Sequence, residues 1–175
     1  MMNKPYTKPI LFVVVVFIIF SGILLINWTL TKESKNKENL NYYTSFVSSV
    51  QSLDKTMSQI NQDKKDNELA ALMFDNYTSI LFVNERLDLL KNNSSMSADL
   101  NSLQNDLSLF KNYYEPLVRN QITNGGNLDT QIYEQMREHF HLFSTTLPAK
   151  YEDSKEFVQQ FDKAVEHLKA LVHLI

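Results

Sequence analysis

A run of seventeen residues from Ile10 to Ile26 is apolar except for one serine and one glycine. Extended to Leu30, the segment has 21 residues. At about 1.5 Å per residue, a helix of that length spans roughly the 30 Å hydrocarbon core of a bilayer. The sequence therefore predicts one transmembrane helix over residues 10–30, with the rest of the chain on one side of the membrane.

The flanks of this segment favour a retained anchor over a cleaved signal peptide. The tail over residues 1–9 has the basic start that both share, but a peptidase site needs small residues at alternating positions after the apolar stretch. The nearest pair, Thr29 and Thr31, meets that need poorly. The chain also has no cysteine for lipid attachment. We therefore interpret residues 10–30 as an uncleaved signal anchor.

Side chains at both ends of the anchor fit the two membrane interfaces. Trp28 has the amphipathic ring typical of the headgroup level, and Lys8 and Lys32 flank the apolar segment. The positive-inside comparison is nearly even, because two lysines precede the segment and three follow it before residue 38. The short tail and the lack of cysteine favour an extracytoplasmic domain. We expect a single-pass protein of the cell membrane with most of its chain outside the cytoplasm.

A juxtamembrane segment over residues 31–36 leads to residues 37–175, which have the pattern of long helices. Glycine and proline are scarce there, and apolar residues recur at steps of three and four. The expected helices cover about 35–62, 68–91, 96–124, 129–147 and 152–175. Short connections favour antiparallel neighbours in a left-handed bundle. The predicted fold class is all-α: an N-terminal transmembrane helix followed by an antiparallel four- to five-helix bundle.

One apolar stripe on each expected helix predicts the core. The stripes are Tyr43, Phe46, Val50, Leu53, Met57 and Ile60; Leu69, Met73, Ile80, Val83, Leu87 and Leu90; Met96, Leu100, Leu103, Leu107, Phe110, Tyr114 and Leu117; Tyr133, Met136, Phe140, Phe143 and Leu147; and Val158, Phe161, Val165, Leu168, Val172 and Ile175. Asn76 interrupts the second stripe. We interpret it as close to solvent or bonded within its own helix, rather than as a buried residue that fixes register.

Capping residues, prolines and glycines predict where the helices begin, end or bend. Residues 92–95, Asn-Asn-Ser-Ser, are expected to supply a C-cap and then an N-cap. Pro116 predicts a kink or a restart of the third helix. The pair Gly125 and Gly126 can adopt positive φ after that helix. Asp129 is the expected N-cap of the fourth helix, and Pro148 marks its end.

No catalytic or ligand-binding signature emerges from the residues. Glu138 and His141 form one Glu-x-x-His pair, but the di-iron bundles that use this pair need a second copy and two further glutamates. Phe140 and Phe143 occupy the inward stripe, which turns the pair toward the flank or solvent. The chain has no cysteine and only three glycines, so thiol catalysis and phosphate loops are unfavourable. We predict no enzyme activity, no metal and no cofactor.

Charge and aromatic placement indicate the kind of partner. After Lys8 the chain has 15 basic against 20 acidic side chains, and that balance repels nucleic acid. Most aromatic residues fall on the predicted stripes and therefore belong to the core. Tyr42, Phe82 and Tyr113 fall beside the stripes, where they either widen the core or contact another chain. We take these three as candidate partner-contact residues.

These observations favour binding over catalysis. The leading hypothesis is a membrane-anchored, non-enzymatic bundle that acts in protein–protein interaction or scaffolding at a bacterial cell envelope, with an unidentified protein partner or a second copy. One alternative is extracytoplasmic ligand sensing through a partner. The layout is similar to the extracytoplasmic halves of bacterial chemoreceptors and sensor kinases, but nothing after Leu30 is apolar enough for their second membrane helix. Another alternative is an inhibitor or immunity-type binding protein.

Overall fold

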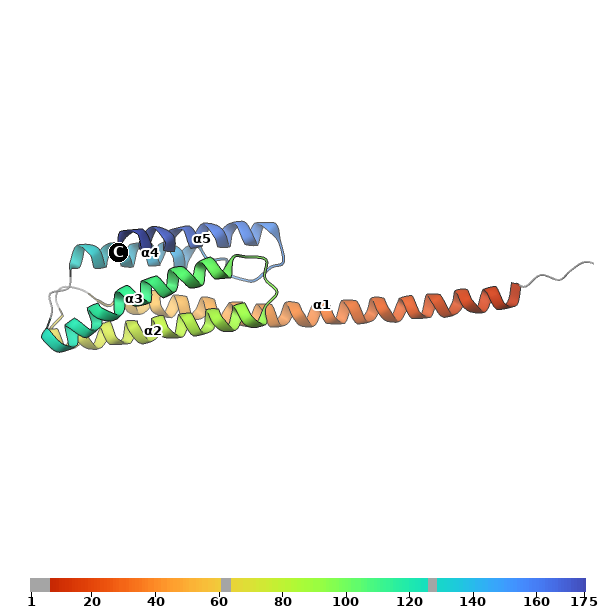
Figure 1. The fold of residues 1–175 in the computed structure, drawn as a ribbon, viewed down its shortest axis with the longest axis horizontal. Helices are drawn as coiled ribbons and strands as arrows, with labels where there is room; N and C mark the ends of the chain where they lie inside the picture. The colour runs from red at the N-terminus through yellow and green to blue at the C-terminus, as the bar shows by residue number, and fades with distance from the viewer. Residues whose placement is uncertain (1–6, 61–63, 126–128) are drawn as a thin grey trace, which may run out of the picture. The chain divides into compact units, whose positions relative to one another are not determined.

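The computed structural model describes the backbone of residues 7–60, 64–125 and 129–175, and the side chains from residue 16 onward within those ranges. These residues form five α-helices and no strand (Figure 1). The helices are α1 (Thr7–Met57), α2 (Asp66–Asn93), α3 (Leu100–Asn124), α4 (Thr130–Thr146) and α5 (Lys155–Leu174). The predicted all-α fold class is confirmed.

The chain divides into two compact units, Met1–Lys37 and Glu38–Ile175, and α1 contributes to both. In the first unit, α1 carries the apolar segment. Among the described helices it is the one that is long and apolar enough to cross a membrane. Its large apolar side chains between Val16 and Leu30 are exposed in the protein alone, as expected of a surface that lipid would cover.

The second unit is a helical bundle around one apolar core. Within it α2 packs on α3, α4 on α5, and α3 on α5 (Figure 1). The predicted stripes of α1 and α4 are buried in full, and those of α2 and α3 are buried except at Leu69, Met96 and Leu117, which are half-buried. The heptad pattern therefore located the core on four of the five helices.

The buried face of α5 differs from the predicted stripe. Val158, Val172 and Ile175 are only half-buried, whereas Phe157, Ala164 and Leu171 are buried in addition to the predicted Phe161, Val165 and Leu168. Ring contacts at the start of the helix account for the change. The centroid of Phe157 lies 5.1 Å from that of Tyr43 and 5.2 Å from that of Tyr151, and these contacts turn the Phe157 side of α5 inward.

The predicted start of α3 is wrong. The helix begins at Leu100, and its N-cap is Asp99, whose side chain accepts a hydrogen bond from the Ser102 amide at 3.1 Å. The Ser95 amide instead donates to Asn39 Oδ1 at 3.2 Å, so residues 94–99 form a loop. Of the predicted kink or restart at Pro116, the restart does not occur, because a single helix runs through Pro116. The proline is exposed, so the carbonyl that loses its donor can face water.

The other end signals are confirmed where the structure describes them. Gly125 adopts a left-handed φ of 57° as the C-cap of α3, whereas Gly126 lies outside the described residues. Asp129 Oδ1 accepts hydrogen bonds from the amides of Gln131 and Ile132, at 3.1 and 3.2 Å. The fourth helix ends at Thr146, just before Pro148.

Asn76 is fully buried, which corrects its interpretation as a residue close to solvent or bonded within its own helix. Its Nδ2 donates to the hydroxyl of Tyr114 on α3 at 3.3 Å and to that of Tyr133 on α4 at 3.1 Å. The Tyr133 hydroxyl donates in turn to the carbonyl of Met57 on α1 at 3.0 Å. Burial raises the pKa of both tyrosines, so both hydroxyls stay neutral. We call these side chains the Asn76 layer, and they join α1, α2, α3 and α4.

A second polar layer lies where the chain enters the bundle. Asn39 Nδ2 donates to Ser95 Oγ at 3.2 Å and to the Tyr151 hydroxyl at 3.1 Å. The Tyr43 hydroxyl donates to the Pro148 carbonyl at 2.7 Å. These bonds, which we call the Asn39 layer, tie the α2–α3 and α4–α5 loops to the first turns of α1 in the bundle.

Replacing Asn76 should weaken the whole bundle. We expect Asn76→Ala to lower the free energy of unfolding by about 1–3 kcal/mol, because two buried hydroxyls lose their amide partner. Urea unfolding of the full chain in mild detergent, followed by circular dichroism, measures the change. Asn93→Ala is the matched control, because the exposed Asn93 amide bonds to the Leu89 carbonyl of its own helix. A loss no larger than that of the control would contradict the structural role of Asn76.

Candidate functional site

The three predicted partner-contact residues lie on three different helices. Tyr42 on α1 and Tyr113 on α3 are half-buried and pack against the core. Of the two predicted alternatives, these two residues therefore widen the core. Phe82 on α2 is 52% exposed. No aromatic pair or hydrogen bond joins the three within the described part of the chain. The structure therefore leaves Phe82 as the member with a free ring surface.

The predicted interface residues of the anchor belong to the first unit. Trp28 is 64% exposed, and Lys32 Nζ lies 5.7 Å from the centroid of its ring, within range of a cation–π contact. The side chain of Lys8 lies outside the described side chains.

An apolar groove lies between α2 and α3. It has a volume of about 210 Å³, and its apolar lining residues include Phe74, Val118 and Ile122. Phe74 is 53% exposed and Ile122 is 55% exposed. Leu81 lies seven residues after Phe74, on the same face of α2, and is also exposed. Phe82 lies about 100° round the helix from Leu81 and is likewise exposed. We call Phe74, Leu81, Phe82 and Ile122 together the apolar surface of α2 and α3.

Polar side chains close one side of this groove. The Tyr77 hydroxyl donates to Glu115 Oε2 at 3.4 Å, and Arg119 Nη2 donates to Glu115 Oε1 at 3.0 Å. Burial, followed by the negative charge of Glu115, raises the pKa of Tyr77, which keeps the phenol a neutral donor. The groove thus has an apolar floor and a hydrogen-bonded rim, a common arrangement at sites that bind other proteins.

Phe74 and Ile122 were not identified from the sequence. Their signal was present, because both are large and apolar. Phe74 lies on the side of α2 opposite the predicted stripe, whereas Ile122 lies beside the α3 stripe, eight residues after Tyr114. The pairing of Phe74 with Ile122 required the α2–α3 register, which the stripes alone do not supply.

His141 contacts Asp54 across the α1–α4 seam. Its Nδ1 lies 3.0 and 3.2 Å from the two carboxylate oxygens, and a depression of about 500 Å³ beside the pair is also lined by Glu134, Arg137 and Glu138. His141 is mainly exposed, as the sequence predicted, but it is bound to α1 rather than free in solvent. No group of three or more His, Asp or Glu side chains is placed to hold a metal ion in the described residues.

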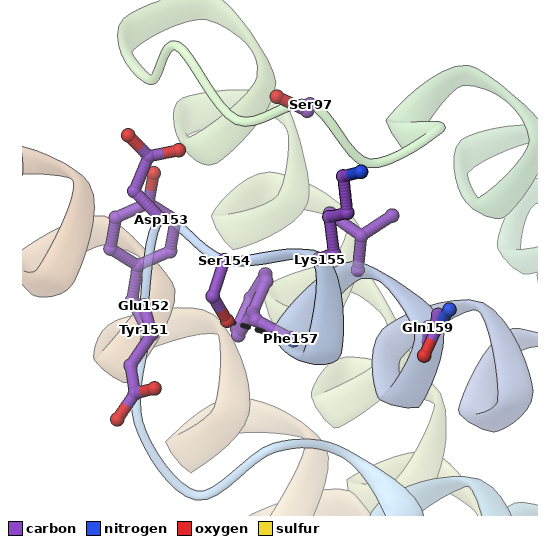
Figure 2. A pocket seen from close by; sticks show the side chains of 9 residues that line it. Ser97, Tyr151, Glu152, Asp153, Ser154, Lys155, Phe157 and Gln159 are labelled. Atoms are coloured by element: carbon purple, nitrogen blue, oxygen red, sulfur yellow. Dashed lines mark hydrogen bonds between the residues drawn. The ribbon is translucent and has the colours of Figure 1, made fainter.

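A pocket of about 440 Å³ lies at the α4–α5 loop (Figure 2). Tyr151, Phe157 and Val158 form its apolar wall, and Ser97 faces it from the α2–α3 loop. Ser154 Oγ accepts a hydrogen bond from the Phe157 amide at 3.1 Å and caps α5. The ring of Tyr151 is held in place through its hydroxyl by the Asn39 layer. The pocket therefore has a fixed wall and an open mouth.

No protein-family model, curated protein or solved structure matches the chain.

Asp106 is placed unfavourably at the α3–α5 seam. Its Oδ2 atom is buried without a hydrogen-bond partner in the described residues. Burial is the main cause that raises its pKa; Glu166 and Asp99 add to the rise, and Lys169 and His173 oppose it. A carboxyl whose pKa is higher in the folded state stabilises the fold when protonated, and this contribution is lost as the pH rises through the folded pKa.

Neutralising Asp106 should therefore stabilise the bundle at neutral pH. We expect Asp106→Asn to raise the free energy of unfolding at pH 7 by less than about 1 kcal/mol, because the side chain is partly solvated. The gain should shrink as the pH falls toward the ordinary carboxyl pKa near 4. Urea unfolding at pH 4, 5, 6 and 7 tests this, with Asp162→Asn on the exposed face of α5 as the control. A gain independent of pH would contradict the role of the buried charge.

Proposed function

We propose that this chain is a membrane-anchored, non-enzymatic helical bundle that acts by binding another protein at the cell envelope. The observation that carries the proposal is the apolar surface at the α2–α3 groove. Phe74, Leu81, Phe82 and Ile122 are each between 42% and 55% exposed on two neighbouring helices. Contiguous large apolar side chains on the surface of a folded domain are typical of interaction sites.

The placement of the bundle outside the cytoplasm is part of this proposal. Its support is the apolar segment of α1 and the lack of cysteine in the sequence. The same architecture could hold the bundle on the cytoplasmic side, where the partners would be cytoplasmic proteins.

Protease protection on intact cells tests that placement. We expect a carboxyl-terminal epitope tag after Ile175 to be removed by external protease while a cytoplasmic control protein survives, because a signal anchor in this orientation exports the bundle. A tag that survives until the membrane is opened would place the bundle in the cytoplasm. The tag is chosen because the bundle itself is compact and a resistant fold alone could mimic protection.

Truncating the groove should release the partner. We expect Phe74→Ser with Ile122→Ser to weaken the complex at least about tenfold, because loss of a buried anchor typically costs more than 1.4 kcal/mol. The tagged full chain, made in its own cells and extracted in mild detergent, is measured by native gel and light scattering against the 20.4 kDa chain mass. Leu109→Ser with Leu174→Ser is the control, because these residues are 52% and 46% exposed but lie outside the groove.

The mass of the complex and its loss in the groove variant distinguish binding of a different protein from self-association. A complex that contains a different protein and survives in the control but not in the groove variant supports the proposal. A mass that is a whole multiple of 20.4 kDa indicates self-association instead. A complex unchanged in the groove variant would contradict the proposed site.

Ligand sensing through a partner is the second candidate, and the pocket at the α4–α5 loop favours it. The pocket of about 440 Å³ is large enough for a small molecule, and its wall of Tyr151 and Phe157 is apolar. Native mass spectrometry of the purified chain distinguishes this function. A bound small molecule that is lost in Phe157→Ala would favour sensing over simple binding.

A further inference from the structure

The charges around the apolar surface of α2 narrow the chemistry of its partner. Between Asp66 and Asn93, the exposed charged residues of α2 are all acidic: Asp66, Glu68, Asp75, Glu85 and Asp88. The two basic residues of the helix, Arg86 and Lys91, are half-buried, and Lys91 is bonded to Gln104. The exposed face of α2 therefore combines large apolar side chains with acidic ones.

Three of these carboxylates stand beside the apolar side chains. Asp75 follows Phe74, and Glu85 and Asp88 lie one and two turns beyond Leu81 on its face. None of the three forms a salt bridge within the described residues. Asp88 accepts a hydrogen bond from the amide of Gln104, which is neutral and leaves the carboxylate charged. The negative charge of all three side chains therefore faces solvent or a partner.

The other side of the groove does not balance this charge. Arg119 is the exposed basic residue among those that line the groove, and it is paired with Glu115 at 3.0 Å. A second copy of this chain that approached through the same face would set acidic residues of α2 against acidic residues of α2. Like charges at an interface cost several kcal/mol, so this face disfavours self-association.

We propose that the α2–α3 surface binds an amphipathic helix of a different protein, one that carries apolar anchors flanked by lysine or arginine. The apolar anchors of that helix would fill the groove at Phe74 and Ile122 and cover Leu81 and Phe82. Its basic residues would pair with Asp75, Glu85 and Asp88. A helix laid in an apolar groove presents its anchors at steps of three, four and seven residues. Phe74 and Leu81, two turns apart on α2, would contact two such anchors. This inference rests on the proposed protein-binding function and adds the chemistry of the partner.

Site-specific photo-crosslinking in the cells that make the protein tests the inference on the full anchored chain. Phe74→p-benzoylphenylalanine and Phe82→p-benzoylphenylalanine place the probe on the surface with little change of shape. The same probe at Leu109 and Leu174 samples exposed apolar positions elsewhere on the bundle. Mass spectrometry then identifies the crosslinked peptide and its sequence.

The expected crosslink from positions 74 and 82 is to a segment of a different protein with an apolar stripe and more lysine and arginine than aspartate and glutamate. Glu85→Lys with Asp88→Lys should lower its yield about tenfold or more, because attraction becomes repulsion. The matched control, Glu156→Lys with Asp162→Lys, reverses two exposed acidic residues on α5 and should leave the yield unchanged.

Several results would overturn the inference. Crosslinks to a second copy of this chain, to lipid alone, or to an acidic or uncharged segment would each exclude the basic helix. A yield that the α2 charge reversal does not change would exclude the electrostatic part. Protein crosslinks at Leu109 or Leu174 without any at Phe74 or Phe82 would refute this surface while leaving the proposed binding function intact. No protein crosslink at any of the four positions would contradict both.

Discussion

The bundle depends on a few polar side chains buried in an otherwise apolar core. Apolar stripes with heptad spacing pack almost equally well after one helix slips by a turn, because the pattern repeats. A buried amide does not tolerate that slip, since its partners would lose their hydrogen bonds. Asn76 bonds to Tyr114 and Tyr133, and Tyr133 bonds to Met57 of α1. These bonds fix the register of four helices relative to one another. The α2–α3 groove exists because this register brings Phe74 opposite Ile122.

The sequence predicted the parts of the fold that depend on local pattern. The stripes of α1 to α4 and the caps at Gly125 and Asp129 follow from spacing and from residue type. It failed where two local signals competed. Serine and aspartate are both good N-caps, so residues 94–95 and Asp99 were competing positions for the start of α3. Asn39 of α1 accepts a hydrogen bond from the Ser95 amide, and the helix therefore begins after Asp99. The two residues of this contact are 56 positions apart, so the sequence around either one does not predict the hydrogen bond.

The candidate site was harder to predict for a related physical reason. A residue beside a stripe can be covered by a neighbouring helix or left free, and only the packing decides. Tyr42 and Tyr113 are covered in part, whereas Phe82 is free. The apolar stripe of α2 predicts only the inward face of the helix, and Phe74 lies on the opposite, outward side. Its seven-residue step to Leu81 was nevertheless readable as a second, outward apolar pair.

The anchor limits which partners the groove can meet. Residues 31–38 separate Leu30 from Asn39, so even a fully extended chain keeps Asn39 within about 31 Å of the end of the proposed anchor. From Asn39 to the Asn76 layer, α1 covers about 27 Å more. The covalent path from the proposed anchor to the Asn76 layer is therefore at most roughly 60 Å long. A tether of that length raises the effective concentration of any partner attached to the same membrane. A surface with only four exposed apolar side chains can then hold a membrane-bound partner at an affinity too weak to capture a freely diffusing one.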